Sequence, residues 1–169
     1  NAGKSINQLL FMEILLFNQY FTSDKKSDEK NFAVLPLNLL CLASFLQSKN
    51  LKCRIYDLGA FSPKESVSEG NRIRYGLSDE KITEIIQKEK PKIIGLGCVY
   101  SRHYIDVINI AILIKKINSN IKIVIGGNHA TDLYEFVLKN NYFDFIVRGE
   151  GEITFYELCR AVLAGERDF

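Results

Sequence analysis

The segment from residue 144 to residue 159, DFIVRGEGEITFYELC, constrains the fold of this chain more than any other. Its apolar run 145–147 is typical of a strand, and a helical pattern begins directly after the turn that follows. Gly149 and Gly151 lie in that turn, where glycine permits a positive φ and a close approach of a ligand to the main chain. Ligands of open α/β sheets bind beyond the carboxyl ends of the strands. The segment therefore predicts an α/β fold and marks the edge at which we expect binding.

The same alternation of strand and helix continues along the chain. Apolar runs predict strands within 6–17 and at 52–58, 92–98, 121–125 and 143–147. Helical patterns are predicted at 37–50, 79–90, 104–118, 132–140 and 154–164. The period of 6–17 fits a strand or a helix, and the polar stretches 22–31 and 61–78 are predicted loops.

Two local signals support the predicted helix starts. Pro36 stands where the first helix opens, a place where the missing N–H of proline costs least. Thr154 and Glu157 have the spacing of a capping box, which predicts that the last helix begins there.

Strands that alternate with helices over short connections form a parallel sheet with right-handed crossovers. We therefore expect a Rossmann-like (flavodoxin-like) α/β fold, with a doubly wound five-stranded parallel sheet of order 2-1-3-4-5 in three α/β/α layers. One domain is expected over residues 3–169, with Asn1 and Ala2 set aside as a remnant of processing or expression.

The composition excludes several classes of protein. The chain has 22 Lys and Arg residues and 20 Asp and Glu residues. The resulting net charge of +2 is too small to indicate a nucleic-acid-binding protein. No apolar run is long enough to cross a membrane. The four cysteines are scattered without a CxxC pair, which argues against a zinc or iron–sulfur site and indicates reduced thiols in a cytoplasmic protein.

The loops after the third, fourth and fifth predicted strands are expected to share one edge of the sheet. Their sequences are CVYSRHY, GGNHATD and RGEGE. Gly126 and Gly127 would expose main chain to a flat or phosphate-bearing ligand, and the amides of the following helix would point outward as donors. The three loops are therefore the candidate binding edge.

These loop residues also have structural interpretations. Gly126 and Gly127 can simply turn the chain. Glu150 and Glu152 resemble an acid/base pair, but acids at a helix start more often complement the helix dipole. Arg148 can pair with one of these acids.

Other chemistries receive little support from the same loops. Thr131 and Asp132 are typical of helix caps, and no ligand spacing supports a metal site at His103 or His129. GLGCVY begins like a dinucleotide-binding fingerprint, but Tyr100 replaces its third glycine. A phosphoacceptor receiver would need aspartate and lysine where Cys98 and Arg148 stand, and a Walker motif is absent.

Four segments, taken together and in order, resemble the cobalamin-binding domain found at the N-terminus of many radical SAM enzymes. They are PLNLLCLASFLQSKNLKCRIYDL, IIGLGCVYS, IKIVIGGNHAT and FDFIVRGEGEITFYEL, and they cover roughly residues 34 to 160. The last two are the most specific, because members of this family typically carry GGxHAT-like and VRGEGE-like segments at this separation.

The resemblance implies a Rossmann-like sheet that binds a corrinoid across its carboxyl edge. Residues 98–102 would lie under the corrin, 126–131 at the nucleotide tail or corrin rim, and 149–152 along the neighbouring wall. The implied cofactor-binding residues are Pro36, Leu37, Cys98, Val99, Tyr100, Ser101, Arg102, Gly126, Gly127, His129, Ala130, Thr131, Gly149, Glu150, Gly151 and Glu152. The resemblance implies no catalytic residue and no metal ligand among them.

The chain departs from the family pattern at two motifs. Where the family often has PPLGLL, Leu35 precedes Pro36 and Asn38 replaces glycine. The separate DxHxxG signature is absent, so the resemblance implies base-off cobalamin, with its own base detached from cobalt and no histidine in its place.

The catalytic half of such an enzyme is absent from these residues, because no CxxxCxxC motif is present. The resemblance implies a radical SAM domain after residue 169 of the same parent chain, carrying a 4Fe–4S cluster and S-adenosylmethionine. The expected function is to position cobalamin for methyl transfer or related radical chemistry. The alternatives are a flavodoxin-like domain for a small ligand or nucleotide, and a non-catalytic interaction domain that has lost corrinoid binding.

Overall fold

A computed structural model describes residues 12–25, 35–60 and 67–166 of the chain. Its main sheet is parallel and has the order β3-β1-β6-β7-β8. The strands are β1 (Ile14–Asn18), β3 (Arg54–Asp57), β6 (Ile93–Gly97), β7 (Lys122–Gly126) and β8 (Phe145–Ile146). In chain order these are the first to fifth strands of the parallel sheet, so the predicted order 2-1-3-4-5 is confirmed.

Burial explains why the central strands read as continuous apolar runs. Residues 14–17 of β1 and all of β6 are buried, because helices cover both faces of the sheet. The stretch 6–17, whose pattern fitted a strand or a helix, forms a strand from Ile14 onward. Residues 6–11 lie outside the described part of the chain. The core consists of two apolar clusters, one on each face.

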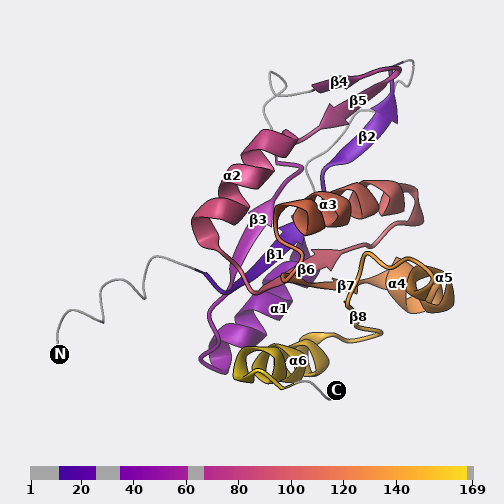
Figure 1. Ribbon diagram of the computed structural model, residues 1–169. Helices are drawn as coiled ribbons and strands as arrows, with labels where there is room; N and C mark the ends of the chain where they lie inside the picture. Colours follow the sequence, from indigo (N-terminus) through magenta and orange to yellow (C-terminus); the bar gives the residue numbers. More distant parts are fainter. Residues whose placement is uncertain (1–11, 26–34, 61–66, 167–169) are drawn as a thin grey trace.

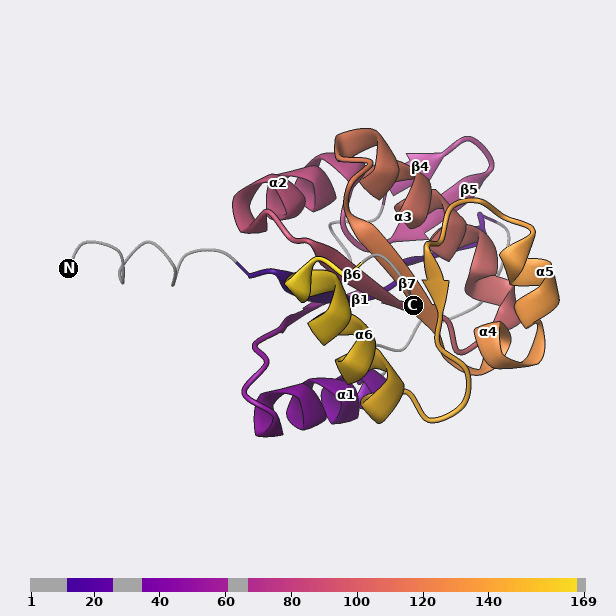
Figure 2. The ribbon, with the colours of Figure 1, turned by 60° about the horizontal axis from the view of Figure 1, so that its bottom comes forward.

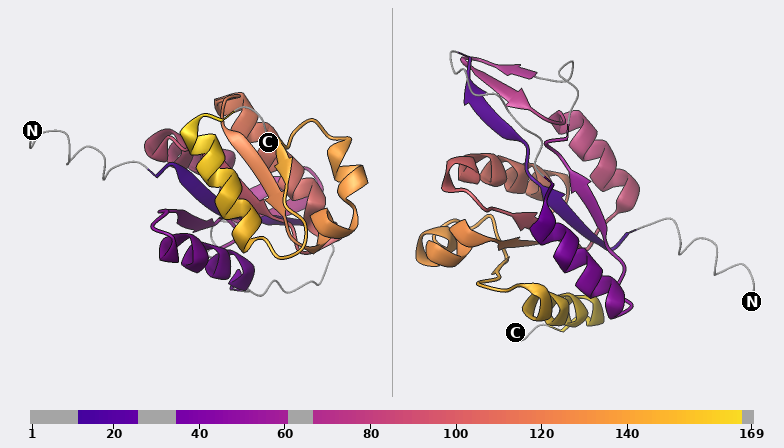
Figure 3. Two further views of the ribbon diagram at one scale, coloured as in Figure 1. Left: turned by 90° about the horizontal axis from the view of Figure 1, so that it is seen from below. Right: turned by 180° about the vertical axis from the view of Figure 1, so that it is seen from behind.

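The helices form the two outer layers, as Figure 1 and the two views of Figure 3 show. The pair α1 (Leu37–Ser48) and α6 (Glu152–Ala164) covers one face, and the two helices lie side by side in Figure 2. The pair α2 (Asp79–Glu89) and α3 (Tyr104–Ile117) covers the other face. These layers confirm the predicted α/β/α architecture.

Short helices occupy the carboxyl edge of the sheet. The 3-10 turn η3 (Ser101–His103) precedes α3, and α4 (Asn128–Asp132) and α5 (Tyr134–Leu138) follow β7. The helix predicted at 132–140 is confirmed at α5, but its start is wrong, because a separate short helix, α4, precedes it. The chain turns helical directly after Gly127 and breaks at Leu133, whose φ of −116° is not helical.

The ends of the long helices follow their capping chemistry in part. Ser78 caps α2 by accepting a hydrogen bond from the Lys81 amide at 3.4 Å. Pro36 occupies the cap position of α1, one residue earlier than in the usual first-turn placement. The capping box predicted at Thr154 is wrong, because α6 begins at Glu152 and its N-cap is Gly151, without a side-chain cap.

A second, antiparallel sheet has the order β2-β5-β4. Its strands are β2 (Phe21–Asp24), β4 (Val67–Glu69) and β5 (Arg72–Tyr75), and it extends past α3 in Figure 1. The predicted loops at 22–31 and 61–78 are wrong where these strands lie, and 26–34 and 61–66 are outside the described residues.

Candidate functional site

A pocket of about 380 Å³ opens between the carboxyl half of the sheet and helices α1 and α6. Side chains of β1, α1 and α6 form its sides, and the loops after β6, β7 and β8 form its rim. Its lining residues are Leu16, Asn38, Leu39, Cys41, Leu42, Gly95, Leu96, Gly97, Val99, Val124, Gly126, Gly127, Asn128, Val147, Gly149, Glu150, Gly151, Glu152 and Phe155.

The floor of the pocket is bare main chain. Gly97 and Gly126 are register partners on the neighbouring strands β6 and β7, so two positions without side chains lie next to each other. Gly95 lies two residues before Gly97 and shares its face of the sheet. A Cβ on Gly95 would stand 2.9 Å from Leu16 Cδ2 and 3.2 Å from Phe155 Cζ. The absence of a side chain at Gly95 therefore lets Leu16 and Phe155 pack close to the strand at the base of the pocket.

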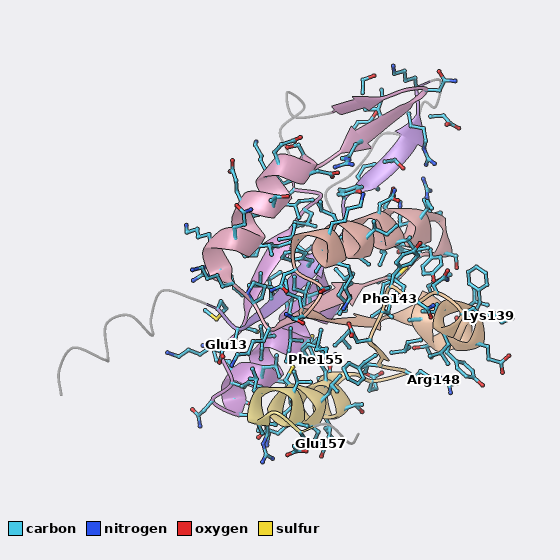
Figure 4. The ribbon with its side chains drawn as sticks, viewed as in Figure 1. Glu13, Lys139, Phe143, Arg148, Phe155 and Glu157 are labelled. Carbon is cyan, nitrogen blue, oxygen red and sulfur yellow. The ribbon has the colours of Figure 1, made fainter. Side chains whose placement is uncertain are left out.

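Two helices supply the walls above this floor. Leu39 and Leu42 come from α1, and a Cβ on Gly97 would lie 3.4 Å from Asn38 Nδ2, so α1 stands directly over the glycine floor. Phe155 projects from α6 and is 2% exposed. Figure 4 shows Phe155 on the side of α6 toward the sheet and Glu157 on the other side.

Main-chain hydrogen bonds join the loops after β6 and β7. The Cys98 amide donates to the Gly126 carbonyl at 2.8 Å, and the His129 amide donates to the Cys98 carbonyl at 3.2 Å. Gly127 between them has a φ of 102°, and a Cβ there would lie 2.6 Å from the Cys98 carbonyl oxygen. Gly127 is thus required by the loop itself, because other residues rarely adopt this φ and any side chain would clash.

The predicted site residues fall into two groups. Seven of them line the pocket: Val99, Gly126, Gly127, Gly149, Glu150, Gly151 and Glu152. The others lie outside its lining: Pro36, Leu37, Cys98, Tyr100, Ser101, Arg102, His129, Ala130 and Thr131. Tyr100 and Leu37 are exposed, at 64% and 65%, whereas Cys98 and Ala130 are fully buried.

His129 packs into the protein beside the rim. It is 4% exposed, its Nδ1 lies 2.8 Å from Ser101 Oγ, and its ring centroid lies 4.2 Å from that of Tyr104. Burial lowers the pKa of His129 below its usual value, opposed by the charge of Asp132. The neutral imidazole is therefore the favoured form.

The caps predicted at Thr131 and Asp132 are wrong, because both residues lie within α4. The Thr131 hydroxyl instead accepts a hydrogen bond from the Gly149 amide at 3.0 Å. Arg148 stacks on Tyr134, with its guanidinium carbon 3.8 Å from the ring centroid, and the described residues show no ion pair between Arg148 and the nearby acids. Glu152 lies in the first turn of α6, which fits the dipole interpretation.

The four thiols differ in their surroundings. Burial raises the pKa of Cys98 and of Cys159 to about 12 and that of the half-buried Cys53 to about 11. Cys41 is exposed on α1 and lines the pocket. Across residues 12–25, 35–60 and 67–166, no three His, Cys, Asp or Glu side chains gather as they would around a metal ion.

Sequence reasoning missed the α1 wall and the floor. The glycines of β6 belong to the rejected dinucleotide fingerprint and to the resembling segment IIGLGCVYS, but neither pattern identifies Gly95 and Gly97 as pocket lining. Cys41 and Leu42 carry no signal of their own, and Asn38 is marked only as a departure from the family pattern, because the packing of α1 over β6 is what brings them to the pocket. Within the described parts of the chain, no helix is long and apolar enough to span a bilayer.

Comparison with known proteins shows the family to which the chain belongs. The family described as "B12 binding domain" matches residues 31–159, which is more than half of the chain. An uncharacterized methyltransferase of Pyrococcus horikoshii is 39% identical over 90 residues, covering 53% of this chain and 19% of that protein.

Two further relatives carry more specific names. An anaerobic magnesium-protoporphyrin IX monomethyl ester cyclase of Rubrivivax gelatinosus is 38% identical over 90 residues, covering 53% of this chain and 16% of the cyclase. The cobalamin-dependent radical SAM methyltransferase TokK of Streptomyces tokunonensis is 32% identical over 81 residues, covering 47% of this chain and 12% of TokK. The chain thus spans less than a quarter of the length of these curated relatives.

Proposed function

The chain belongs to the B12-binding domain family and is a cobalamin-binding module, and on that premise we propose that it holds the corrinoid base-off. In this arrangement the nucleotide base is detached from cobalt and buried in the pocket between α1, α6 and the sheet. The observation that carries the proposal is the pair of glycines in the pocket lining, Gly97 and Gly126, which brings the main chain of two neighbouring strands to the pocket so that a planar base can pack close to it.

The size of the pocket supports a nucleotide tail as its occupant. A volume of about 380 Å³ is at the lower end of the range for small-molecule sites. A corrin macrocycle with its amide side chains is wider than this, whereas a benzimidazole ring with its ribose is compact and flat. The macrocycle would therefore remain outside, across the loops at the carboxyl edge.

Polar groups at the rim suit the remainder of the cofactor. Asn38 and Asn128 offer amides, and the main chain of Gly149 and Gly151 leads into the N-terminus of α6, where amides favour a phosphate. The carboxylate of Glu150 can accept hydrogen bonds from the amide side chains of a corrin. These groups would fix the orientation of the tail, while Leu39 and Phe155 enclose the base.

The two histidines of the chain support the absence of a protein ligand below cobalt. Neither lines the pocket. His129 is buried with its Nδ1 on Ser101, and His103 lies 3.8 Å from the Asp106 carboxylate. Because neither imidazole reaches the pocket, the chain would hold the corrinoid through its nucleotide tail and through contacts at the rim, without an axial histidine.

We further propose that this module serves a radical SAM domain of the same parent polypeptide in the cytoplasm. That domain would carry the 4Fe–4S cluster and S-adenosylmethionine, as the name of the TokK relative suggests. Bound cobalamin would supply the group-transfer chemistry, in methyl transfer or a related radical reaction. The residues of this chain would bind the cofactor, orient it and exclude water from its tail.

Titration with hydroxocobalamin tests the proposal directly. The visible spectrum should change to that of the base-off form as the cofactor binds. Cobinamide, which lacks the nucleotide, should bind at least tenfold more weakly because it cannot fill the pocket, and FMN should not bind. An unchanged base-on spectrum, equal affinity for cobinamide, or no binding of cobalamin would each overturn the proposal.

A further inference from the structure

Two hydrogen bonds connect the three rim loops in series. The side chains that make them belong to Ser101, His129 and Thr131, and none of these residues lines the pocket. We infer that Ser101, His129 and Thr131 are positioning residues, which hold the rim in the shape that receives the corrinoid. This inference rests on the proposed function. It replaces the expectation that these three side chains touch the cofactor.

The first link joins the loop after β6 to the loop after β7. His129 Nδ1 and Ser101 Oγ are 2.8 Å apart, and the imidazole is held from the side by the ring of Tyr104. Tyr104 is itself fixed, since its hydroxyl accepts a hydrogen bond from Asn140 Nδ2 at 2.9 Å. The exposed Ser101 is thus tied to a buried and well-packed partner.

The second link joins the loop after β7 to the loop after β8. Thr131 Oγ1 accepts from the Gly149 amide, and Thr131 belongs to the same short helix as His129. Gly149 has a φ of 65°, and a Cβ there would meet no atom within 4 Å, so no neighbouring atom packs over this position. The Thr131 hydroxyl is therefore a specific restraint on the 148–151 turn.

The helix α4 is the common support of both links. It is anchored by the main-chain bond from His129 to Cys98 and by Ala130, which is fully buried. The turns that it restrains contain Val99 on one side and Gly149, Glu150 and Gly151 on the other, all of which line the pocket. Ordering these turns before the ligand arrives removes part of the entropy cost of binding.

A threonine series isolates the second link. Thr131→Val keeps the shape and removes the acceptor, and cobalamin should bind about two- to tenfold more weakly, as expected for one hydrogen bond. Thr131→Ser restores the hydroxyl and should restore affinity. Thr83→Val is the matched control, because the Thr83 hydroxyl also makes a hydrogen bond, at 2.7 Å to the Asp79 carbonyl on α2, away from the rim.

The dissociation rate of cobalamin from each variant shows whether these side chains position the rim or only stabilise the fold. We expect Thr131→Val and Ser101→Ala to raise the rate, with Thr131→Ser and Thr83→Val close to the parent chain. All four should share its base-off spectrum and melt within a few degrees of it. Unchanged dissociation from Thr131→Val and Ser101→Ala would overturn the inference, as would the same increase in Thr83→Val. Failure of the parent chain to bind cobalamin would instead refute the proposed function.

Discussion

Filling the floor of the pocket at Gly126 should abolish most cobalamin binding without unfolding the protein. Gly126 ends β7 with an ordinary φ, and a Cβ there would lie 3.5 Å from the Val147 carbonyl oxygen, which is normal contact. In Gly126→Leu the side chain would occupy on the order of 100 Å³. That is about a quarter of the 380 Å³ pocket.

The size of the effect follows from overpacking. A bound base would have to displace the leucine or the walls, and such overpacking costs about 1–3 kcal/mol. This corresponds to a roughly 5- to 150-fold higher Kd. Gly127 is unsuitable for the same test, because a side chain there would clash with the main chain of Cys98 and alter the loop itself.

The assay is a spectral titration of hydroxocobalamin into Gly126→Leu and into a control. Ala164→Leu also introduces a leucine, at the exposed end of α6 and outside the pocket, and should bind like the parent chain. Circular dichroism verifies that both variants keep their secondary structure. A folded Gly126→Leu variant with the Kd of the parent chain would show that the pocket does not hold the cofactor.

Three further results are expected. Cys41 should be the fastest thiol to react with iodoacetamide, since Cys98 is buried with its pKa raised to about 12, and saturating cobalamin should protect Cys41; equal alkylation with and without cobalamin contradicts this. Because burial lowers the pKa of His129, the folded state favours the neutral ring, and stability should fall as pH decreases below the unfolded pKa of about 6.5. Thermal melts from pH 7.5 to 5.5 should therefore show a smaller loss in His129→Gln, and parallel curves would refute the assignment. Asp106→Asn should lower the free energy of unfolding in urea by about 1–3 kcal/mol, because the buried carboxylate accepts from both the amide and the hydroxyl of Thr22; an unchanged midpoint would contradict it.

The parallel sheet was predictable because its signals are local. Each of its strands is a short apolar run between turn signals, and Pro91 and Gly165 end helices as their chemistry requires. The strand order then follows from the rules for crossovers. The three loops were expected at one edge, and the hydrogen bonds between Cys98 and the 126–129 turn confirm this for two of them.

The antiparallel sheet was not predictable in the same way, because its strands depend on partners far away in the sequence. Phe21 stacks on Tyr75 with ring centroids 5.1 Å apart, and Thr22 is held by Asp106 from α3. Taken alone, these segments are short and polar. Their strand structure comes from tertiary pairing, which overrides weak local preference.

The site was predictable at the level of loops and not of side chains. Sequence position placed His129 and Thr131 on the rim, but only the folded structure shows that they lie outside the pocket lining and bond to Ser101 and to the Gly149 amide. The role of Gly95 follows from Leu16 and Phe155, and that of Gly97 from Asn38 and Leu39, which pack beside them only in the folded chain. A sequence motif does not distinguish the residues of a loop that line the pocket from the residues that hold the loop in place.

Electron paramagnetic resonance of Co(II) cobalamin bound to the chain tests the central claim most directly. A nitrogen ligand below cobalt, from the nucleotide base or from a histidine, splits the cobalt lines by coupling to the nitrogen nucleus. With the base buried in the pocket and neither histidine in the pocket lining, the account predicts lines without nitrogen splitting. Lines that keep the splitting of free base-on cobalamin would contradict it.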